Sequence, residues 1–297
     1  MSDARINRGG RARFPSVLTV IPHHDVTELR FSTWRSRSVG FRVRAFVVRG
    51  VLIDSGPPSG AAALARYIAA SRPRGALITH FHEDHAGGVG ALINADVPLW
   101  MDGRTAARVL TPPRIGFYRR YTWGSPTPAR PHAAFELPDA LTAIATPGHS
   151  EDHHVVWDSA TGTLFGGDLF IGVKVRGAHR SEQPRALVQS LRQVMALAPA
   201  RLCDAHRGLV TNPVPLLAAK AAWMERTLDA IDTRIARGEA DAAIARAVLG
   251  HDKLARWFTG GDYTMANFVA AARAESQTVR KSDASPDGTS RPADATN

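Results

Sequence analysis

The chain has 297 residues, 44% of them hydrophobic, and a formal net charge of +10. This length suffices for one large domain with an appendage. The single cysteine, Cys203, excludes an intramolecular disulfide, and we expect its thiol to be packed in the core. We find no apolar run of about 18 residues and no signal peptide, so we expect a cytoplasmic protein with no membrane partner. The positive charge comes from dispersed arginines, and we therefore do not expect nucleic acid as a partner.

Predicted strands and helices follow one another over residues 15–212, which favours one α/β domain with helices covering its sheets. The Gly-containing basic arm before it, residues 1–14, is expected to be disordered. Short apolar runs predict strands at 17–21, 28–34, 41–48, 51–53, 76–79, 97–101, 141–145, 163–165 and 201–204. Helices are predicted at 59–70, 84–93 and 104–110.

The segment 80–85, directly after the predicted strand 76–79, reads His-Phe-His-Glu-Asp-His. Imidazole and carboxylate together are the ligand set of zinc and similar divalent ions. Because side chains alternate along an extended segment, His80 and His82 are expected on one side of the strand end. Asp84 and His85 lie where the chain turns into a helix. One loop could therefore supply two neighbouring metal ions.

Three further ligand-type residues follow short predicted strands, beside small or turn-forming neighbours. His149 follows a Pro-Gly pair, Asp168 follows a Gly-Gly pair, and His206 lies two residues after Asp204. Strands that enter a functional site are expected to end in this way. Together with the segment 80–85, these residues would supply two three-ligand sets and a shared carboxylate.

The order of these residues resembles the metallo-β-lactamase-fold superfamily of metallohydrolases, over roughly residues 17–212. The resemblance implies a four-layer αββα sandwich, here with a C-terminal helical appendage. It also implies two divalent metal ions, with zinc favoured over iron or manganese. The implied ligands of the first ion are His80, His82 and His149, those of the second are Asp84, His85 and His206, and Asp168 bridges both.

Three residues near the ligands are expected to act in other ways. The resemblance gives Asp54 the role of supporting the ligand loop through hydrogen bonds. His153, four residues after His149, has a spacing also seen in the superfamily and could orient a ligand, although simple packing explains it equally well. Glu83 faces away from the ligands in the strand alternation and is not expected to bind metal.

Two divalent ions about 3.5 to 4 Å apart can share a water and lower its pKa, so a metal-bridging hydroxide is the expected nucleophile. Asp84 or Asp168 would orient this hydroxide or accept its proton, which makes them the candidate catalytic carboxylates. One ion would stabilise the negative charge that develops on the substrate. We therefore expect a dinuclear metal-dependent hydrolase acting on an ester, thioester or lactone of a small anionic molecule.

Residues 111–136 contain five prolines and several aromatic side chains without a clear period, and we expect a long loop there. Such a loop could overhang the metals, which makes Arg114, Tyr118 and Tyr121 candidate substrate contacts. Lys174, six residues after Asp168, could pair with a substrate carboxylate. A surface loop with solvated basic residues is an equal alternative.

Beyond His206 the sequence becomes rich in alanine, and residues 213–276 are expected to form a helical region. Apolar residues at helical spacing predict helices at 216–237, 240–249 and 263–274. This region would pack against the sheet domain or against a second subunit in a homodimer. Residues 277–297 are polar and are expected to form a disordered tail.

The substrate is only partly constrained by the sequence. Hydroxyacylglutathione hydrolases resemble this chain in the ligand loop, but they usually place a tyrosine two residues after the last ligand histidine, where this chain has Gly208. That difference argues against a glutathione thioester. Two alternatives stay open: a mononuclear iron sulfur dioxygenase of the persulfide type, using chiefly His80, His149 and Asp168, and a phosphodiesterase or nuclease that uses the basic surface.

Overall fold

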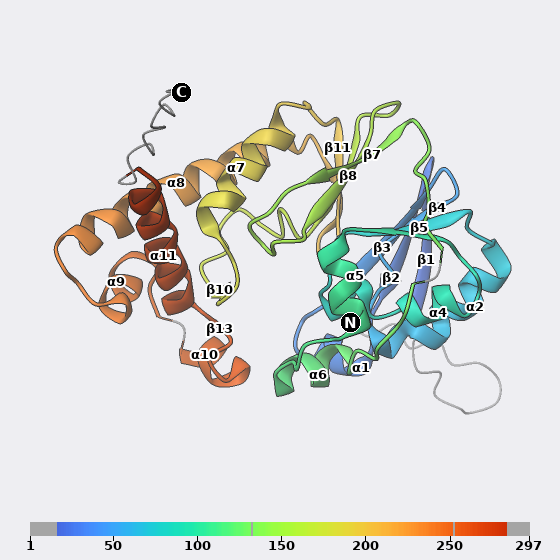
Figure 1. Ribbon diagram of the computed structural model, residues 1–297, viewed down its shortest axis with the longest axis horizontal. Helices are drawn as coiled ribbons and strands as arrows, with labels where there is room; N and C mark the ends of the chain where they lie inside the picture. Colours follow the sequence, from blue (N-terminus) through green and yellow to red (C-terminus); the bar gives the residue numbers. More distant parts are fainter. Residues whose placement is uncertain (1–16, 132, 252, 284–297) are drawn as a thin grey trace, which may run out of the picture.

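A computed structural model describes residues 17–131, 133–251 and 253–283. The predicted arm at residues 1–14 and most of the predicted tail, residues 284–297, lie outside the described residues. Two sheets lie face to face between two groups of helices (Figure 1). The expected four-layer αββα arrangement with a C-terminal helical appendage is confirmed.

The first sheet has six strands in the order β1-β2-β3-β4-β5-β6. These strands are β1 (Leu18–His23), β2 (Val26–Phe31), β3 (Val43–Val48), β4 (Val51–Ile53), β5 (Gly75–Ile78) and β6 (Leu99–Met101). The first four strands pair antiparallel, whereas β4, β5 and β6 are parallel. Parallel neighbours need a crossover. The crossovers contain η1 (Pro58–Gly60), α2 (Ala61–Ser71), α3 (Glu83–Ala86) and α4 (Val89–Ile93).

The second sheet has five strands in the order β12-β11-β9-β8-β7. They are β7 (Leu141–Ala145), β8 (His154–Asp158), β9 (Thr163–Gly167), β11 (Arg201–Asp204) and β12 (Gly208–Thr211). Strands β9 and β11 are parallel, and α7 (Pro184–Met195) connects them. The other neighbours pair antiparallel.

Adjacent residues of one strand enter different cores, as alternation along a pleated strand requires. Ile78 of β5 packs on the outer face of the first sheet with Leu64 of α2, whereas Leu77 lies between the two sheets with Phe165 of β9. Leu164, the neighbour of Phe165, packs on the outer face of the second sheet with residues of α7. The two sheets thus bury a shared core, and each has a helical cover.

The helix predicted at residues 84–93 is two short helices, α3 and α4, separated at Gly87 and Gly88. A Cβ on Gly87 would lie 2.2 Å from the Pro58 ring, and one on Gly88 would lie 2.3 Å from the Ser55 carbonyl oxygen. The chain bends where its backbone packs directly on the segment after β4. This close approach holds the proposed ligand loop against the first sheet.

Residues 111–136 were predicted as a loop, but they contain the helix α6 (Phe117–Trp123). This helix packs on α1 (Trp34–Ser38), where Trp34 and Tyr121 make an edge-to-face ring contact. Helix α5 (Gly103–Leu110) precedes this segment, close to the range expected for it. A seven-residue helix is too short to produce a clear apolar period, which explains why the sequence did not reveal α6.

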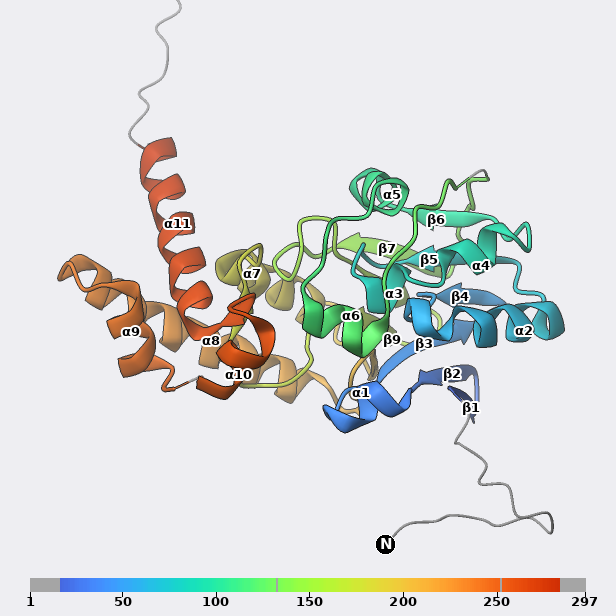
Figure 2. The ribbon, with the colours of Figure 1, turned by 90° about the horizontal axis from the view of Figure 1, so that it is seen from below.

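The C-terminal helices lie at the end of the molecule opposite to α2 and α4 (Figure 1, Figure 2). They are α8 (Val214–Ala236), α9 (Asp241–Val248), α10 (Lys253–Thr259) and α11 (Met265–Asp283). A two-stranded sheet of β10 (Ala178–His179) and β13 (Tyr263–Thr264) joins them to the segment after β9. Helix α11 ends later than expected, within the predicted tail. None of the helices in the described ranges is long and apolar enough to cross a membrane.

Candidate metal centre

The proposed metal ligands lie after the ends of strands at one edge of the two sheets. His80 and His82 follow β5, and Asp84 and His85 begin the helical segment after them. The remaining three lie beyond three strands of the second sheet: His149 after β7, Asp168 after β9 and His206 after β11. The facing sheets therefore bring together residues that are more than 120 positions apart in the chain.

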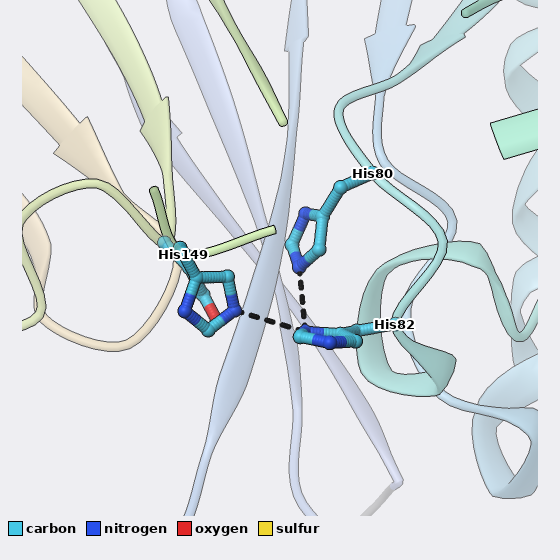
Figure 3. A group of neighbouring side chains, drawn as sticks. His80, His82 and His149 are labelled. Atoms are coloured by element: carbon cyan, nitrogen blue, oxygen red, sulfur yellow. Dashed lines mark hydrogen bonds and ion pairs between the residues drawn. The ribbon is translucent and has the colours of Figure 1, made fainter. Parts of the chain in front are cut away.

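The first group consists of His80, His82, His149 and Asp168, whose ligand atoms all lie within 4.8 Å of one another. His82 Nδ1 lies 3.0 Å from His80 Nε2 and 2.9 Å from His149 Nε2. Figure 3 shows these three imidazoles turned toward a common centre. His149 Nε2 also lies 3.2 Å from Asp168 Oδ2.

The second group consists of Asp84, His85 and His206. Asp84 Oδ2 lies 3.6 Å from His206 Nε2 and 4.0 Å from His85 Nε2. Asp168 reaches this group with its other oxygen, because Oδ1 lies 3.2 Å from His85 Nε2 and 3.1 Å from His206 Nε2. The Asp168 carboxylate therefore stands between the two groups with one oxygen directed at each.

These residues fit a pair of divalent ions. A tetrahedral zinc with Zn–N bonds of about 2.0 to 2.1 Å places its ligand atoms about 3.3 Å apart, close to the separations found here. His85 Nε2 and Asp168 Oδ1 are buried, and although they lie 3.2 Å apart, neither makes a hydrogen bond within the described residues. Buried polar atoms without a partner are costly unless an ion or water satisfies them. The donor set and these unsatisfied atoms both favour metal binding.

Hydrogen bonds place a proton on Nδ1 of three imidazoles, so that Nε2 is the nitrogen directed at the centre. The Thr79 hydroxyl donates to Asp54, and it therefore accepts from His80 Nδ1, at 3.0 Å. His85 Nδ1 donates to Asp54 Oδ2 at 2.7 Å, and His206 Nδ1 donates to the Arg42 carbonyl oxygen at 2.9 Å. Each ring thus directs Nε2 at the centre, and this nitrogen can bind a metal once it carries no proton.

Asp54 acts on both the strand and the ligand loop. One of its oxygens accepts from the Thr79 backbone N–H at 2.8 Å, and the other accepts from His85. Its side chain is buried, and its backbone has a φ of 64°, a left-handed conformation just beyond β4. The carboxylate therefore holds His85 against the end of β5 and belongs to neither group of ligand-type residues itself, which agrees with the role that the resemblance implies.

His153 is buried beside the centre and supports Asp168. Its Nε2 accepts from the backbone N–H of Asp168 at 3.0 Å, so its proton is on Nδ1, which donates to the Thr146 hydroxyl at 2.8 Å. Burial, followed by the charge of neighbouring His149, holds the pKa of His153 well below its usual range, so the ring is neutral. This geometry gives His153 a specific contact with the segment that carries Asp168.

The carboxylates of the centre raise the pKa values of two of its histidines, His206 and His85. Burial opposes protonation of His206, but Asp168 and Asp84 outweigh this effect and raise its pKa to about 9. Burial likewise opposes protonation of His85, yet Asp168, Asp54 and Asp84 raise the pKa of His85 well above its usual value. Without metal, both imidazoles therefore carry protons near neutral pH, at the positions where a divalent ion would place its charge.

A cavity of about 470 Å³ opens onto both ligand groups. Tyr118 of α6 lines it, as expected of a substrate contact. Tyr121 instead lines a neighbouring hollow with Trp34. Arg114 and Lys174 are exposed and do not line the cavity.

The sequence did not reveal two buried charged residues next to the centre. Lys220 of α8 is buried, and its ammonium donates to the carbonyl oxygens of Leu169 and Phe170, directly after Asp168. Glu182 Oε1 accepts from the His179 backbone N–H at 3.0 Å and lies 3.8 Å from His149 Nδ1. Neither residue belongs to a motif, and only the folded chain brings them to the site.

Glu83, between two proposed ligands, also has a partner that the sequence did not reveal. It is absent from both ligand groups, as expected, but it is buried rather than turned to solvent. Its carboxylate makes a bidentate ion pair with Arg119 of α6, with Arg119 Nε 2.7 Å from Glu83 Oε1. The ligand loop is thereby fastened to the helix that forms one wall of the cavity.

Two curated relatives match about half of the chain. A hydroxyacylglutathione hydrolase of Thiobacillus denitrificans is 33% identical over 139 residues, which cover 46% of this chain and 48% of that protein. A beta-lactamase-like protein 2 homolog of Drosophila melanogaster is 28% identical over 149 residues, covering 46% of each. The chain thus spans about half the length of the curated relatives it matches.

Solved structures agree with the fold. The chain superimposes on TMB-1 with a TM-score of 0.54 and 19% identity, covering 71% of this chain and 99% of that one. A metallo-beta-lactamase of Erythrobacter litoralis gives a TM-score of 0.54 and 18% identity, covering 72% and 98%. The sequence model of the metallo-beta-lactamase superfamily matches residues 40–206, more than half of the chain. The chain therefore belongs to the metallo-beta-lactamase superfamily.

Proposed function

We propose that this chain is a dinuclear zinc hydrolase that cleaves an ester, thioester or lactone of a small molecule. The observation that carries the proposal is the position of Asp168, whose two oxygens face two separate groups of buried ligand-type residues. If only the first group bound a metal ion, Asp84, His85 and His206 would be a buried group of ligand-type residues with no ion to bind. The second group therefore favours a two-metal hydrolase over a mononuclear iron dioxygenase.

The chain's own residues would orient the reactants. Bound divalent ions would lower the pKa of a shared water and polarise the substrate carbonyl. Asp84 and Asp168 both line the cavity, where either carboxylate could orient the attacking water or accept its proton. Cys203 is unsuited to attack, since burial raises the pKa of its thiol to about 12 and its side chain lies between the sheets.

The choice among acyl substrates rests on the relatives and on Gly208. A relative named hydroxyacylglutathione hydrolase supports thioester cleavage as one activity of this chain. Gly208 has a φ of 83°, and a Cβ there would lie 3.1 Å from Arg44 Nε. A tyrosine at this position would need a different backbone. We therefore propose that this chain hydrolyses an acyl compound, and that the substrate is not a glutathione thioester.

The test is turnover by zinc-loaded protein offered esters, thioesters, lactones and phosphodiesters. We expect cleavage of at least one acyl class, with His80→Ala and Asp168→Ala each lowering kcat by about 100-fold or more. The control is His24→Asn, because His24 is exposed in the turn between β1 and β2 and should leave turnover unchanged. Cleavage of phosphodiesters alone, or oxygen consumption by an iron-loaded sample, would contradict the proposal.

A further inference from the structure

The wall of the cavity over the proposed metal centre is rich in aromatic side chains. Phe41 and Trp123 form one side, with ring centroids 6.1 Å apart, and Trp123 also lies 6.5 Å from the His206 ring. Phe41 is 46% exposed although it contacts Trp123. Apolar surface beside the centre is therefore left open for a ligand to cover.

The C-terminal helical region supplies the opposite side of the same cavity. Phe258 of α10 and Tyr263 of β13 line it together with Tyr118 of α6. The rings of Tyr118 and Phe258 lie 5.9 Å apart, and α6 and α10 face each other in both ribbon views (Figure 1, Figure 2). A molecule in this cavity would therefore lie beside aromatic side chains from two distant parts of the chain.

The charged side chains of this cavity offer little to an anionic substrate. Arg119 lines it, but its guanidinium is held by Glu83. Burial, followed by the charge of Arg119, lowers the pKa of His179 to about 4, so His179 is neutral at pH 7. Arg42 also lines the cavity, and its side chain is exposed to water. Arg119 and His179 therefore offer no free positive charge to a substrate, and Arg42 offers one only on a side chain that is exposed to water.

From this wall we infer that the acyl compound cleaved here carries a large apolar group, aromatic or long-chain, which lies between the Phe41–Trp123 pair and the Tyr118–Phe258 pair. This inference rests on the proposed function and narrows its substrate class. The free energy gained on binding rises with the apolar area that is covered, so an apolar arm would gain much of its affinity in this cavity. A compact, highly charged substrate would leave the same surface exposed.

The experiment compares p-nitrophenyl octanoate with p-nitrophenyl acetate, which share a leaving group and differ only in the apolar arm. We expect zinc-loaded protein to show a kcat/KM at least about 10-fold higher for the octanoate. Phe258→Ala should lower kcat/KM for the octanoate by about 10-fold and change the acetate value by less than about 3-fold. Phe41→Ala should act in the same direction, and its exposed side chain makes misfolding no explanation for the loss.

Trp257→Ala is the matched control. Trp257 is the neighbour of Phe258 in the same helix, is 80% exposed and does not line the cavity, so both kcat/KM values should stay unchanged. Equal kcat/KM values for octanoate and acetate, or equal losses of kcat/KM in the Phe258 and Trp257 variants, would overturn the inference. The protein would then be an acyl hydrolase that does not prefer substrates with a large apolar group.

A binding measurement separates the two proposals. Anilinonaphthalene sulfonate, which becomes fluorescent on apolar surfaces, should bind zinc-loaded protein, and Phe258→Ala should weaken this binding by about 10-fold whereas Trp257→Ala should not. Protein that binds the probe in this way but cleaves no acyl compound would support the apolar cavity and contradict the hydrolase. Binding that both variants leave unchanged would contradict the apolar cavity.

Discussion

Arg119 in α6 makes a bidentate ion pair with Glu83, the residue that separates the proposed ligands His82 and Asp84. Both partners are largely buried, with 14% of the Arg119 side chain and 2% of the Glu83 side chain exposed. The contact joins the wall of the cavity to the loop at its floor. A change in α6 should therefore affect both the stability of the protein and the shape of its candidate site.

Removing the arginine should be costly. Arg119→Met leaves the Glu83 carboxylate buried without a partner, and we expect a loss of about 3 to 5 kcal/mol in the free energy of unfolding, measured with urea. The double variant Arg119→Met with Glu83→Gln should recover part of that loss, because no charge is then left unpaired. A single variant as stable as the unchanged protein would show that solvent reaches Glu83.

Asp54 should govern metal affinity although it belongs to neither ligand group. Asp54→Ala removes the acceptor of His85 Nδ1 and of the Thr79 N–H, so we expect zinc affinity to fall by about 10- to 100-fold. Competition with a chromophoric chelator measures this change. The exposed Asp139, in the turn before β7, provides the control, and Asp139→Ala should bind zinc normally. Unchanged affinity in Asp54→Ala would remove Asp54 from the support of the site.

The sequence indicated which residues the fold brings together at this centre, because the signals are local. The segment 80–85 concentrates ligand-type side chains, and His149, Asp168 and His206 each follow a short strand, in an order that resembles the superfamily. The fold then depends on short apolar runs, which are readable along β4 and β5. Both patterns can be recognised in a sequence because they involve residues that are close together in the chain or that directly follow a predicted strand.

The long-range contacts could not be predicted in the same way. Lys220 contacts the segment after Asp168 from a helix about 50 residues further along the chain. Arg119 contacts Glu83 from a short helix within a proline-rich segment. A buried lysine and an exposed one look alike in a sequence, because only packing decides which is which. The expected contacts Arg114 and Lys174 failed to line the cavity for the same reason.

Metal binding should release protons. In metal-free protein the carboxylates raise the pKa of His206 to about 9 and that of His85 well above its usual value, so both rings are protonated at pH 7. A divalent ion must displace these protons, and we expect a release of about two per chain. Affinity should fall as pH falls, because protons then compete better. Calorimetry in buffers of different ionisation enthalpy measures the release, and a buffer-independent heat would contradict it.

Cys203 should be inert in the folded protein. Its side chain is buried between the sheets, and burial raises the pKa of the thiol to about 12, so little thiolate forms at pH 8. We expect a thiol reagent such as dithionitrobenzoate to label the chain only after unfolding in guanidinium. Rapid labelling under native conditions would mean that the space between the two sheets opens readily.

The most direct measurement is the number and position of bound ions, from elemental analysis and from anomalous diffraction at the zinc edge. We expect two zinc ions per chain, one on either side of the Asp168 carboxylate, and we expect the ion beside His80 to be lost in His80→Ala. One ion per chain at saturating zinc, or ions away from Asp168, would contradict the paired centre on which the proposed hydrolysis depends.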